Sequence, residues 1–200
     1  MLAGVNPPKY HERLVSGFHD IQDKNALAWS VLDHKSEQFV TAAIATAINR
    51  KAGLRIAHIE FDRVDLVILT ERIKPRLGRH LDWPAASLVM SYEAKAGQLF
   101  DFAPGYRRPK NIYVGGHLNA DMVGLRRATG AGVFFMYEVA DPTKHLKYFT
   151  GHTTDVDDAV AELCRNMTNG TLVAREVISC GQADETDVSI HMCVFDPNEE

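Results

Sequence analysis

The sequence predicts a mixed β-sheet flanked by helices, an α/β or α+β domain. Segments with apolar residues at helical spacing alternate along the chain with short segments typical of strands. They follow the order helix, three strands, helix, strand, helix, two strands. The 200 residues are 46% hydrophobic and 24% charged, which fits a single globular domain with a sizeable core.

The N-terminal third of the chain is predicted to be helical. Residues 10–21 and 36–51 both repeat apolar side chains at helical spacing. The second segment has the stronger pattern, with Ser36 as a suitable N-cap and Gly53 just past its end.

Three predicted strands follow, at residues 54–61, 64–70 and 86–95. Asp62 and Arg63 form the turn between the first two strands. The residues between the second and third strands, 71–86, contain Pro75, Gly78 and Pro84 and are predicted to be a loop.

The second half of the chain alternates again between loops, helices and strands. Pro104, Gly105 and Pro109 indicate a second long loop. The predicted elements are this loop at 101–116, a helix at 118–129, a buried strand at 132–140, a helix from Thr154, and strands at 172–180 and 187–195. The last two strands flank a polar turn at 181–186 and are expected to form a hairpin.

The stretch SYEAK ends the third strand with a carboxylate and an ammonium. Side chains on a strand alternate between faces, so Glu93 and Lys95 share one face, about 6–7 Å apart. If this strand pairs antiparallel with residues 64–70, Asp65 at the start of that segment lies beside both. We therefore expect Asp65, Glu93 and Lys95 to converge.

This arrangement suits a divalent cation. Two adjacent carboxylates repel each other, and a cation between them makes the pair favourable. Mg²⁺ prefers one or two carboxylates together with waters and phosphate oxygens, and Mn²⁺ is expected to substitute for it. The backbone carbonyl of Ala94 could add a ligand. The Lys95 ammonium could orient an attacking water and stabilise charge that develops on a phosphate.

VDLVI at residues 64–68, followed by SYEAK at 91–95, resembles the D…E-x-K core of the PD-(D/E)XK nuclease superfamily, which has the restriction-endonuclease-like fold. The order of predicted elements is similar to that family's common core, α-β-β-β-α-β. The resemblance covers roughly residues 36–140, and a C-terminal extension of about 141–200 completes the single domain.

The resemblance implies a role for each residue of the motif. Asp65 and Glu93 would be metal ligands and Lys95 the catalytic lysine. The family often adds a glutamate from the helix before the sheet, and Glu37 occupies that position. The residue before Asp65 is Val64, where the family's pattern has proline, a position at which many members vary.

Simpler interpretations of these residues stay open. An E-x-K sequence on a strand is also typical of a solvated face with a cross-strand ion pair. A glutamate in a first helical turn, such as Glu37, is favoured by the helix dipole without any function.

Nucleic-acid contacts are expected next to this motif. Gln98 follows Lys95 by three residues and could touch substrate or water. The loop sequence GYRRPK could contact phosphates and stack on a base, through Tyr106, Arg107, Arg108 and Lys110. The alternative is a merely solvated loop. The formal net charge of −4 provides no general attraction to nucleic acid, so any such site must be local.

Other classes of function lack support in the sequence. The nine histidines and three cysteines have no zinc-ligand spacing, and no P-loop or G-x-G-x-x-G motif indicates a nucleotide cofactor. The cysteines have apolar neighbours, as expected for buried thiols in a reducing compartment. We find no signal-peptide pattern and no apolar run long enough for a membrane helix, and expect a cytoplasmic protein.

The sequence thus predicts a Mg²⁺-dependent deoxyribonuclease, an endonuclease acting on DNA, with RNA left open as a second substrate. A homodimer would supply two sites for the two strands of a duplex, and the final hairpin could form its interface or contact the substrate. The alternative is a non-catalytic member of the same fold that binds nucleic acid or protein within an assembly. The net charge of −4 and the lack of a DNA-reading motif favour that alternative, whereas the presence of Asp65, Glu93 and Lys95 together disfavours it, because a non-catalytic relic should have lost one of them.

Overall fold

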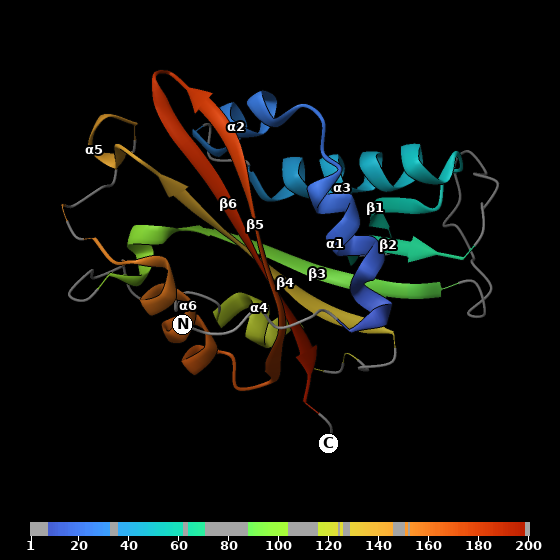
Figure 1. Cartoon of the computed structure of the whole chain (residues 1–200). Coiled ribbons are helices and arrows are strands. Elements are labelled where there is room, and N and C mark those ends of the chain that lie inside the picture. Colours follow the sequence, from blue (N-terminus) through green and yellow to red (C-terminus); the bar gives the residue numbers. More distant parts are fainter. Residues whose placement is uncertain are drawn as a thin grey trace.

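The chain folds around one six-stranded sheet with the strand order β1-β2-β3-β4-β6-β5 (Figure 1). The computed structural model describes residues 8–32, 36–61, 64–70, 88–103, 116–123, 125, 129–145, 151 and 153–198. The strands are β1 (Ala57–Phe61), β2 (Val64–Leu69), β3 (Leu88–Gln98), β4 (Gly130–Val139), β5 (Gly170–Ala183) and β6 (Thr186–Pro197). The neighbours β3 and β4 are parallel, and all other neighbours are antiparallel.

Helices cover both faces of this mixed sheet, so the predicted α+β class is confirmed. The helices are α1 (Glu12–His19), α2 (Lys24–Leu32), α3 (Ser36–Ala52), α4 (Gly116–Asp121), α5 (Pro142–His145) and α6 (Val156–Asn166), with short 3-10 turns η1 (Lys9–His11) and η3 (Leu99–Phe102). The first three helices lie on one face, and α4 and α6 lie on the other (Figure 1). No helix in the described ranges is long and apolar enough to cross a membrane.

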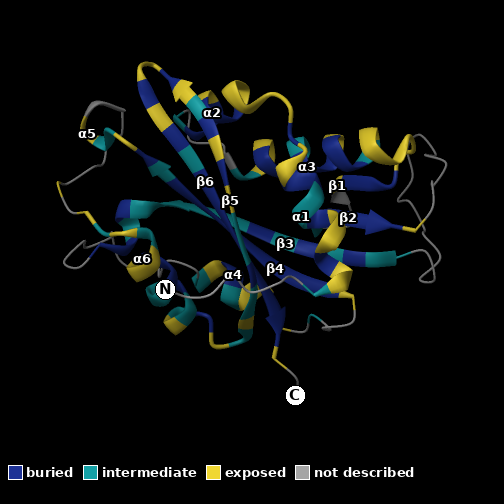
Figure 2. Cartoon of the chain, in the orientation of Figure 1, coloured by how far each residue is buried: buried dark blue, intermediate teal, exposed yellow. Residues whose placement is uncertain are grey.

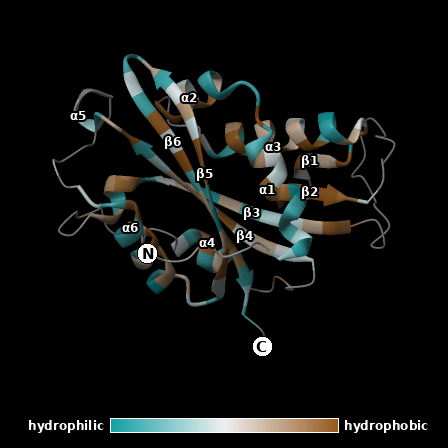
Figure 3. Ribbon diagram, viewed as in Figure 1, coloured by the Kyte–Doolittle hydropathy of each residue, from teal (hydrophilic) through white to brown (hydrophobic). Residues whose placement is uncertain are grey.

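The central strands separate two apolar cores. Along β4, Phe135 and Tyr137 contribute to the core under α1 and α3, whereas Phe134 and Met136 contribute to the core under α4 and α6. β4 is therefore buried along almost its whole length (Figure 2). β2 is hydrophobic after its second residue, Asp65 (Figure 3). A strand buried on both faces needs apolar side chains at successive positions, which explains the continuous apolar sequence of β4.

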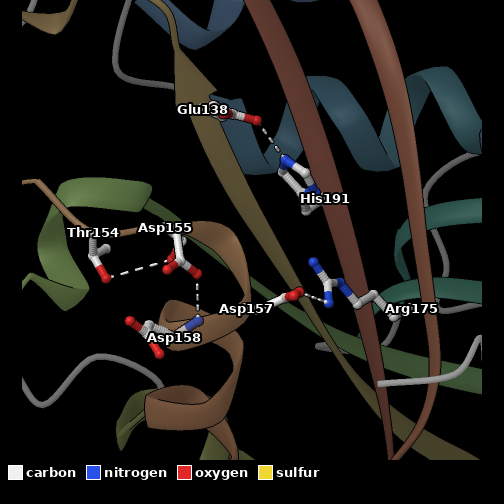
Figure 4. Close-up of polar contacts among 7 residues, drawn as sticks. All are labelled: Glu138, Thr154, Asp155, Asp157, Asp158, Arg175 and His191. Carbon is white, nitrogen blue, oxygen red and sulfur yellow. Dashed lines mark hydrogen bonds and ion pairs between the residues drawn. The ribbon is translucent and has the colours of Figure 1, made fainter. Parts of the chain in front are cut away.

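Several predicted boundaries are wrong. The predicted helix at 118–129 is α4, which starts earlier and ends at Asp121, before the poor helix former Gly124. The strand predicted to start at residue 54 starts at Ala57, and β3 runs on to Gln98. The helix predicted to open at Thr154 has Asp155 as its N-cap, whose Oδ1 accepts a hydrogen bond from the backbone N–H of Asp158 at 2.8 Å (Figure 4).

The helix α2 is absent from the elements predicted from the sequence. Its apolar side chains lie around the whole helix, with Leu27 and Val31 buried but Trp29 51% exposed, so no one-sided stripe indicates it. The final hairpin forms as predicted, but its turn is shorter than residues 181–186. Asp184 and Glu185 alone make the turn, with φ values of 48° and 62°. These positive φ values usually require Asn or Gly, and that signal is lacking here.

The hairpin extends the main sheet, because β6 pairs with β4 over the length of that strand. The predicted loop at 71–86 lies outside the described residues. The predicted loop at 101–116 begins inside η3 and ends at the first residue of α4, and the residues between Ala103 and Gly116 also lie outside them.

A buried polar network ties both ends of the described chain to β3. His11 Nε2 lies 2.9 Å from Asp196 Oδ1, and His11 Nδ1 lies 3.0 Å from the Tyr92 hydroxyl. Tyr10 donates a hydrogen bond to the other Asp196 oxygen. Burial lowers the pKa of His11, against the opposing effect of Asp196. A neutral imidazole satisfies all these groups, because Nε2–H donates to Asp196 and Nδ1 accepts from Tyr92.

Removing the acceptor of this network should destabilise the fold. His11 is 0% exposed and Asp196 is 1% exposed, so Asp196→Ala leaves a buried imidazole without its carboxylate. We expect a loss of about 2–4 kcal/mol in the free energy of unfolding, measured by urea denaturation. The control is Asp20→Ala, which removes a carboxylate from the solvent-exposed ion pair with Lys51 and should leave the free energy of unfolding close to the wild-type value. Equal losses in the two variants would contradict the proposed role of the network.

Candidate active site

The antiparallel pairing of β2 and β3 sets the geometry of the predicted site. Leu66 lies opposite Tyr92, so the same register puts Asp65 opposite Glu93. β2 begins one residue before Asp65, whereas β3 continues to Gln98. The last residues of β3 therefore extend beyond the start of β2, and this end of the pair is where the motif lies.

Asp65 is fixed on the backbone of β3. Its Oδ2 accepts a hydrogen bond from the backbone N–H of Ala94 at 2.7 Å. Ala94 is the middle residue of the E-A-K stretch, and its own side chain is buried on the opposite face. The contact brings the Asp65 carboxylate between the flanking side chains of Glu93 and Lys95. The predicted convergence of these three residues is therefore present in the structure.

Glu93 and Asp65 form a carboxyl pair. Burial, together with the charge of the neighbouring Asp65 and a hydrogen bond to it, raises the pKa of Glu93 to about 7. Two adjacent carboxyl groups avoid repulsion when one of them keeps a proton. Near neutral pH the pair therefore holds a proton that a cation could displace.

Lys95 lies against the same group of oxygens. Its Nζ donates to the Ala94 carbonyl at 2.9 Å and lies 3.0 Å from Asp121 Oδ2 and 3.7 Å from Asp65 Oδ2. Burial acts to lower the pKa of Lys95, but the hydrogen bond with Asp121 and the charges of Asp65, Glu37 and Asp121 outweigh it and raise the pKa above its ordinary value. The side chain is thus an ammonium held by acceptors on three sides.

Glu37 interacts through its charge with Lys95, Asp65 and Asp121. It lies in the first turn of α3, the helix on the other face of the sheet from α4. Burial raises its pKa, Asp65 and Asp121 add to that effect, and Lys95 opposes it. Its proximity fits the predicted supporting role, although the helix dipole also favours an acidic residue there.

Asp121 is the residue that the sequence analysis missed. It ends α4, a helix that the chain places over the strand pair β3 and β4. Gly132 lies opposite Glu93 in that pair, and a side chain on Gly132 would bring its Cβ within 2.7 Å of Met122 Sδ. The glycine therefore permits the close approach of α4. A single aspartate in a helix gives no signal in the sequence, and only this packing reveals it.

The predicted nucleic-acid contacts have different outcomes. Gln98 ends β3 and is the N-cap residue of η3, where its backbone N–H donates a hydrogen bond to Asp101 Oδ2 at 2.8 Å. Gln98 follows Lys95 by three positions, and side chains along a strand alternate between the two faces of the sheet. The Gln98 side chain therefore lies on the face opposite Lys95. It lines a cavity of about 180 Å³ with Tyr137 and Thr154. Tyr106, Arg107, Arg108 and Lys110 lie outside the described residues.

A divalent cation fits the donor set. In the described part of the chain, no group of three or more His, Cys, Asp or Glu side chains could hold an ion by itself. Mg²⁺ is usually bound by one or two carboxylates, with waters and substrate oxygens completing its shell. Asp65, Glu93 and the Ala94 carbonyl match that requirement. The Lys95 ammonium already contacts two of these three groups, so a positive charge is accommodated there.

Comparisons with known proteins identify no relative of this chain. No protein-family model, curated protein or solved structure matches this chain. The chemistry of the carboxyl pair, Lys95 and Asp121 therefore carries the functional argument.

Replacing Glu93 by glutamine should change how stability depends on pH. The folded pKa of about 7 exceeds the ordinary value of 4.5, so the folded protein binds the proton more tightly than the unfolded chain. This stabilisation is full below about 4.5 and is lost as the pH rises through 7. Glu93→Gln removes that loss, so its advantage over the wild type should reach about 1–2 kcal/mol above pH 7 and shrink in acid.

Urea denaturation of both proteins across this pH window measures the difference. The control is Glu162→Gln on α6, which removes a solvent-facing carboxylate paired with Arg165 and should change stability by less than about 1 kcal/mol. A Glu93→Gln protein that follows the wild type at every pH would contradict a carboxyl pair at this position.

Proposed function

We propose that this protein is a Mg²⁺-dependent nuclease of the PD-(D/E)XK type that hydrolyses phosphodiester bonds in DNA. The observation that carries the proposal is the convergence of Asp65, Glu93 and Lys95 at the open end of the β2–β3 pair. Perturbed carboxyl and ammonium groups that share one site are typical of active sites.

The fold adds support to this proposal. Helix α3 is followed by the antiparallel strands β1, β2 and β3, then by α4 and the parallel strand β4. This order is similar to the common core of the nuclease superfamily. Within it, Asp65 comes from the second strand, Glu93 and Lys95 come from the third, and Glu37 comes from the helix before the sheet.

The charge balance at the site favours a role for a cation. Among the described residues, the Lys95 ammonium pairs with Asp65 and Asp121 and also feels the charges of Glu37 and Glu93. A phosphate approaching this excess of acidic groups would be repelled. A bound divalent cation would reverse that repulsion, and displacement of the proton from Glu93 would make both carboxylates available as ligands.

In this proposal Asp65, Glu93 and the Ala94 carbonyl hold the cation. When bound, Mg²⁺ supplies positive charge that polarises a phosphate oxygen and lowers the pKa of a bound water. Lys95 orients the attacking water and stabilises the phosphate as the water oxygen bonds to phosphorus and the bond to the leaving sugar oxygen breaks. The proton released by the water ends on that leaving oxygen.

The substrate and setting rest on the same proposal. We propose DNA as the substrate of an endonuclease, with RNA as the second candidate, and a homodimer that places one site on each strand of a duplex. We also propose a cytoplasmic location. The second functional candidate is a non-catalytic binding protein of this fold, which the net charge of −4 favours. The pairing of Glu93 with Asp65 beside the Lys95 ammonium favours the nuclease over a purely binding protein.

Nuclease assays with and without Mg²⁺ or Mn²⁺ test the proposal directly. The wild type should cleave DNA only with the metal, and Lys95→Ala should reduce the rate at least about 100-fold because the water loses its positioning group. Lys51→Ala is the matched control, since Lys51 forms a solvent-exposed pair with Asp20, and it should cleave at the wild-type rate.

Two outcomes would count against these assignments. A wild type that cleaves neither DNA nor RNA with either metal excludes the nuclease. Metal-dependent cleavage that persists undiminished in Lys95→Ala keeps the nuclease and removes the role given to Lys95.

A further inference from the structure

Lys95 occupies the place where the proposed cation should bind. Its Nζ contacts the Ala94 carbonyl at 2.9 Å and lies 3.7 Å from Asp65 Oδ2. Both oxygens belong to the proposed ligand set of the metal. An ammonium and a divalent cation cannot share these oxygens without strong repulsion. Binding of the cation therefore requires Lys95 to give up its contact with the Ala94 carbonyl.

The third acceptor of Lys95 offers a position for the displaced ammonium. Asp121 Oδ2 lies 3.0 Å from Lys95 Nζ, closer than Asp65, and comes from a different element, α4. Lys95 can keep this contact while it leaves the Ala94 carbonyl. The side chains are 27% and 40% exposed, which leaves room for such a movement.

α4 holds Asp121 at a fixed position. Besides its close packing over Gly132, the helix is bonded to the turn before β5 through Asn119. Asn119 Oδ1 accepts from Asn169 N at 2.8 Å, and the Asn119 carbonyl accepts from Asn169 Nδ2 at 2.9 Å. Asn119 Nδ2 also donates to Thr168 Oγ1 at 3.1 Å. Asp121 is therefore presented to Lys95 by an anchored element.

We propose that Asp121 is a positioning residue that acts through Lys95: it retains the ammonium when a divalent cation replaces it between Asp65 and the Ala94 carbonyl. This inference rests on the proposed metal-dependent function. Asp121 weakens the competition between Lys95 and the cation, and it keeps Lys95 near the water that it orients. It need not touch the metal or the substrate.

Mn²⁺ binding without nucleic acid tests this role. Titration calorimetry would compare the wild type with Asp121→Asn, Lys95→Met and the double variant. In Asp121→Asn the ammonium stays on the Ala94 carbonyl and Asp65, so Mn²⁺ affinity should fall about three- to fivefold, as expected for a partly exposed ion pair. Lys95→Met removes the competitor and should bind Mn²⁺ more tightly than the wild type.

The double variant decides between action through Lys95 and direct action on the metal. If Asp121 acts through Lys95, adding Asp121→Asn to Lys95→Met should leave the affinity unchanged. An equal loss in both backgrounds would show that Asp121 acts on the cation itself and would overturn the inference. Wild-type affinity in Asp121→Asn alone, or weaker binding in Lys95→Met, would also overturn it.

Two further variants control for charge and folding. Asp157→Asn removes a carboxylate on α6 whose partner is Arg175, at 2.6 Å (Figure 4). This variant should leave Mn²⁺ affinity unchanged. A loss of affinity equal to that in Asp121→Asn would show that the effect comes from the net charge of the protein alone and would overturn the inference. Asp121→Glu keeps a carboxylate on α4 and should retain most of the affinity, whereas a loss as large as in Asp121→Asn contradicts the inference.

Activity at saturating Mn²⁺ gives an independent readout. Asp121→Asn should lower kcat about tenfold or more through the loss of water positioning, with the KM for DNA unchanged. An increase in KM alone would mean that Asp121 contacts the substrate, and would overturn the inference. A wild type that binds no Mn²⁺ would overturn the proposed function and this inference together, whereas normal Mn²⁺ binding that is insensitive to Asp121 overturns the inference alone.

Discussion

The hydrogen bond from the Ala94 amide to the Asp65 carboxylate is the contact on which the site depends. It forms because β2 begins just before Asp65 while β3 runs on, so a side chain from one strand reaches the backbone of its neighbour. Once Asp65 is fixed there, it faces Glu93 on one side and Lys95 on the other. Asp65 in this position adds to the effect of burial in raising the pKa of Glu93, and together with Asp121 it holds the Lys95 ammonium.

Strand alternation lets β3 serve two purposes at once. Tyr92 and Ala94 point into the core, where Tyr92 also joins the buried network with His11. Glu93 and Lys95 point to the opposite face and meet Asp65 and Asp121. The network that ties the start of the chain to β6 therefore also fixes the backbone that carries the charged residues. A rigid strand suits a site whose geometry must hold within a fraction of an ångström.

The charged groups of the site affect one another's protonation and position. Within the described part of the chain, acidic residues outnumber ammonium groups at the site, and burial raises the pKa of Glu93 so that one carboxyl tends to keep its proton. Lys95 neutralises part of this excess negative charge, and its ammonium lies at the position proposed for the metal. α4 then supplies Asp121 from the far side of Lys95, because Gly132 lets the helix approach the sheet. Such a balance is sensitive to a cation, and this is why metal binding is the decisive measurement.

The sequence by itself determined the local part of this protein. The apolar periods predicted the sheet and most of its elements, and the period of two in β3, with an aspartate opening an apolar strand, predicted that Asp65, Glu93 and Lys95 meet. Each of these patterns lies within one short segment. The antiparallel register of β2 and β3 then suffices to bring Asp65 beside Glu93 and Lys95. The tertiary structure alone decided the rest. α2 has apolar residues on all sides, and Asp121 is a lone acidic residue that becomes part of the site only where α4 packs against β4. Contacts between elements that are distant in the sequence depend on the shape of the whole core, so the spacing of residues along the chain does not predict them.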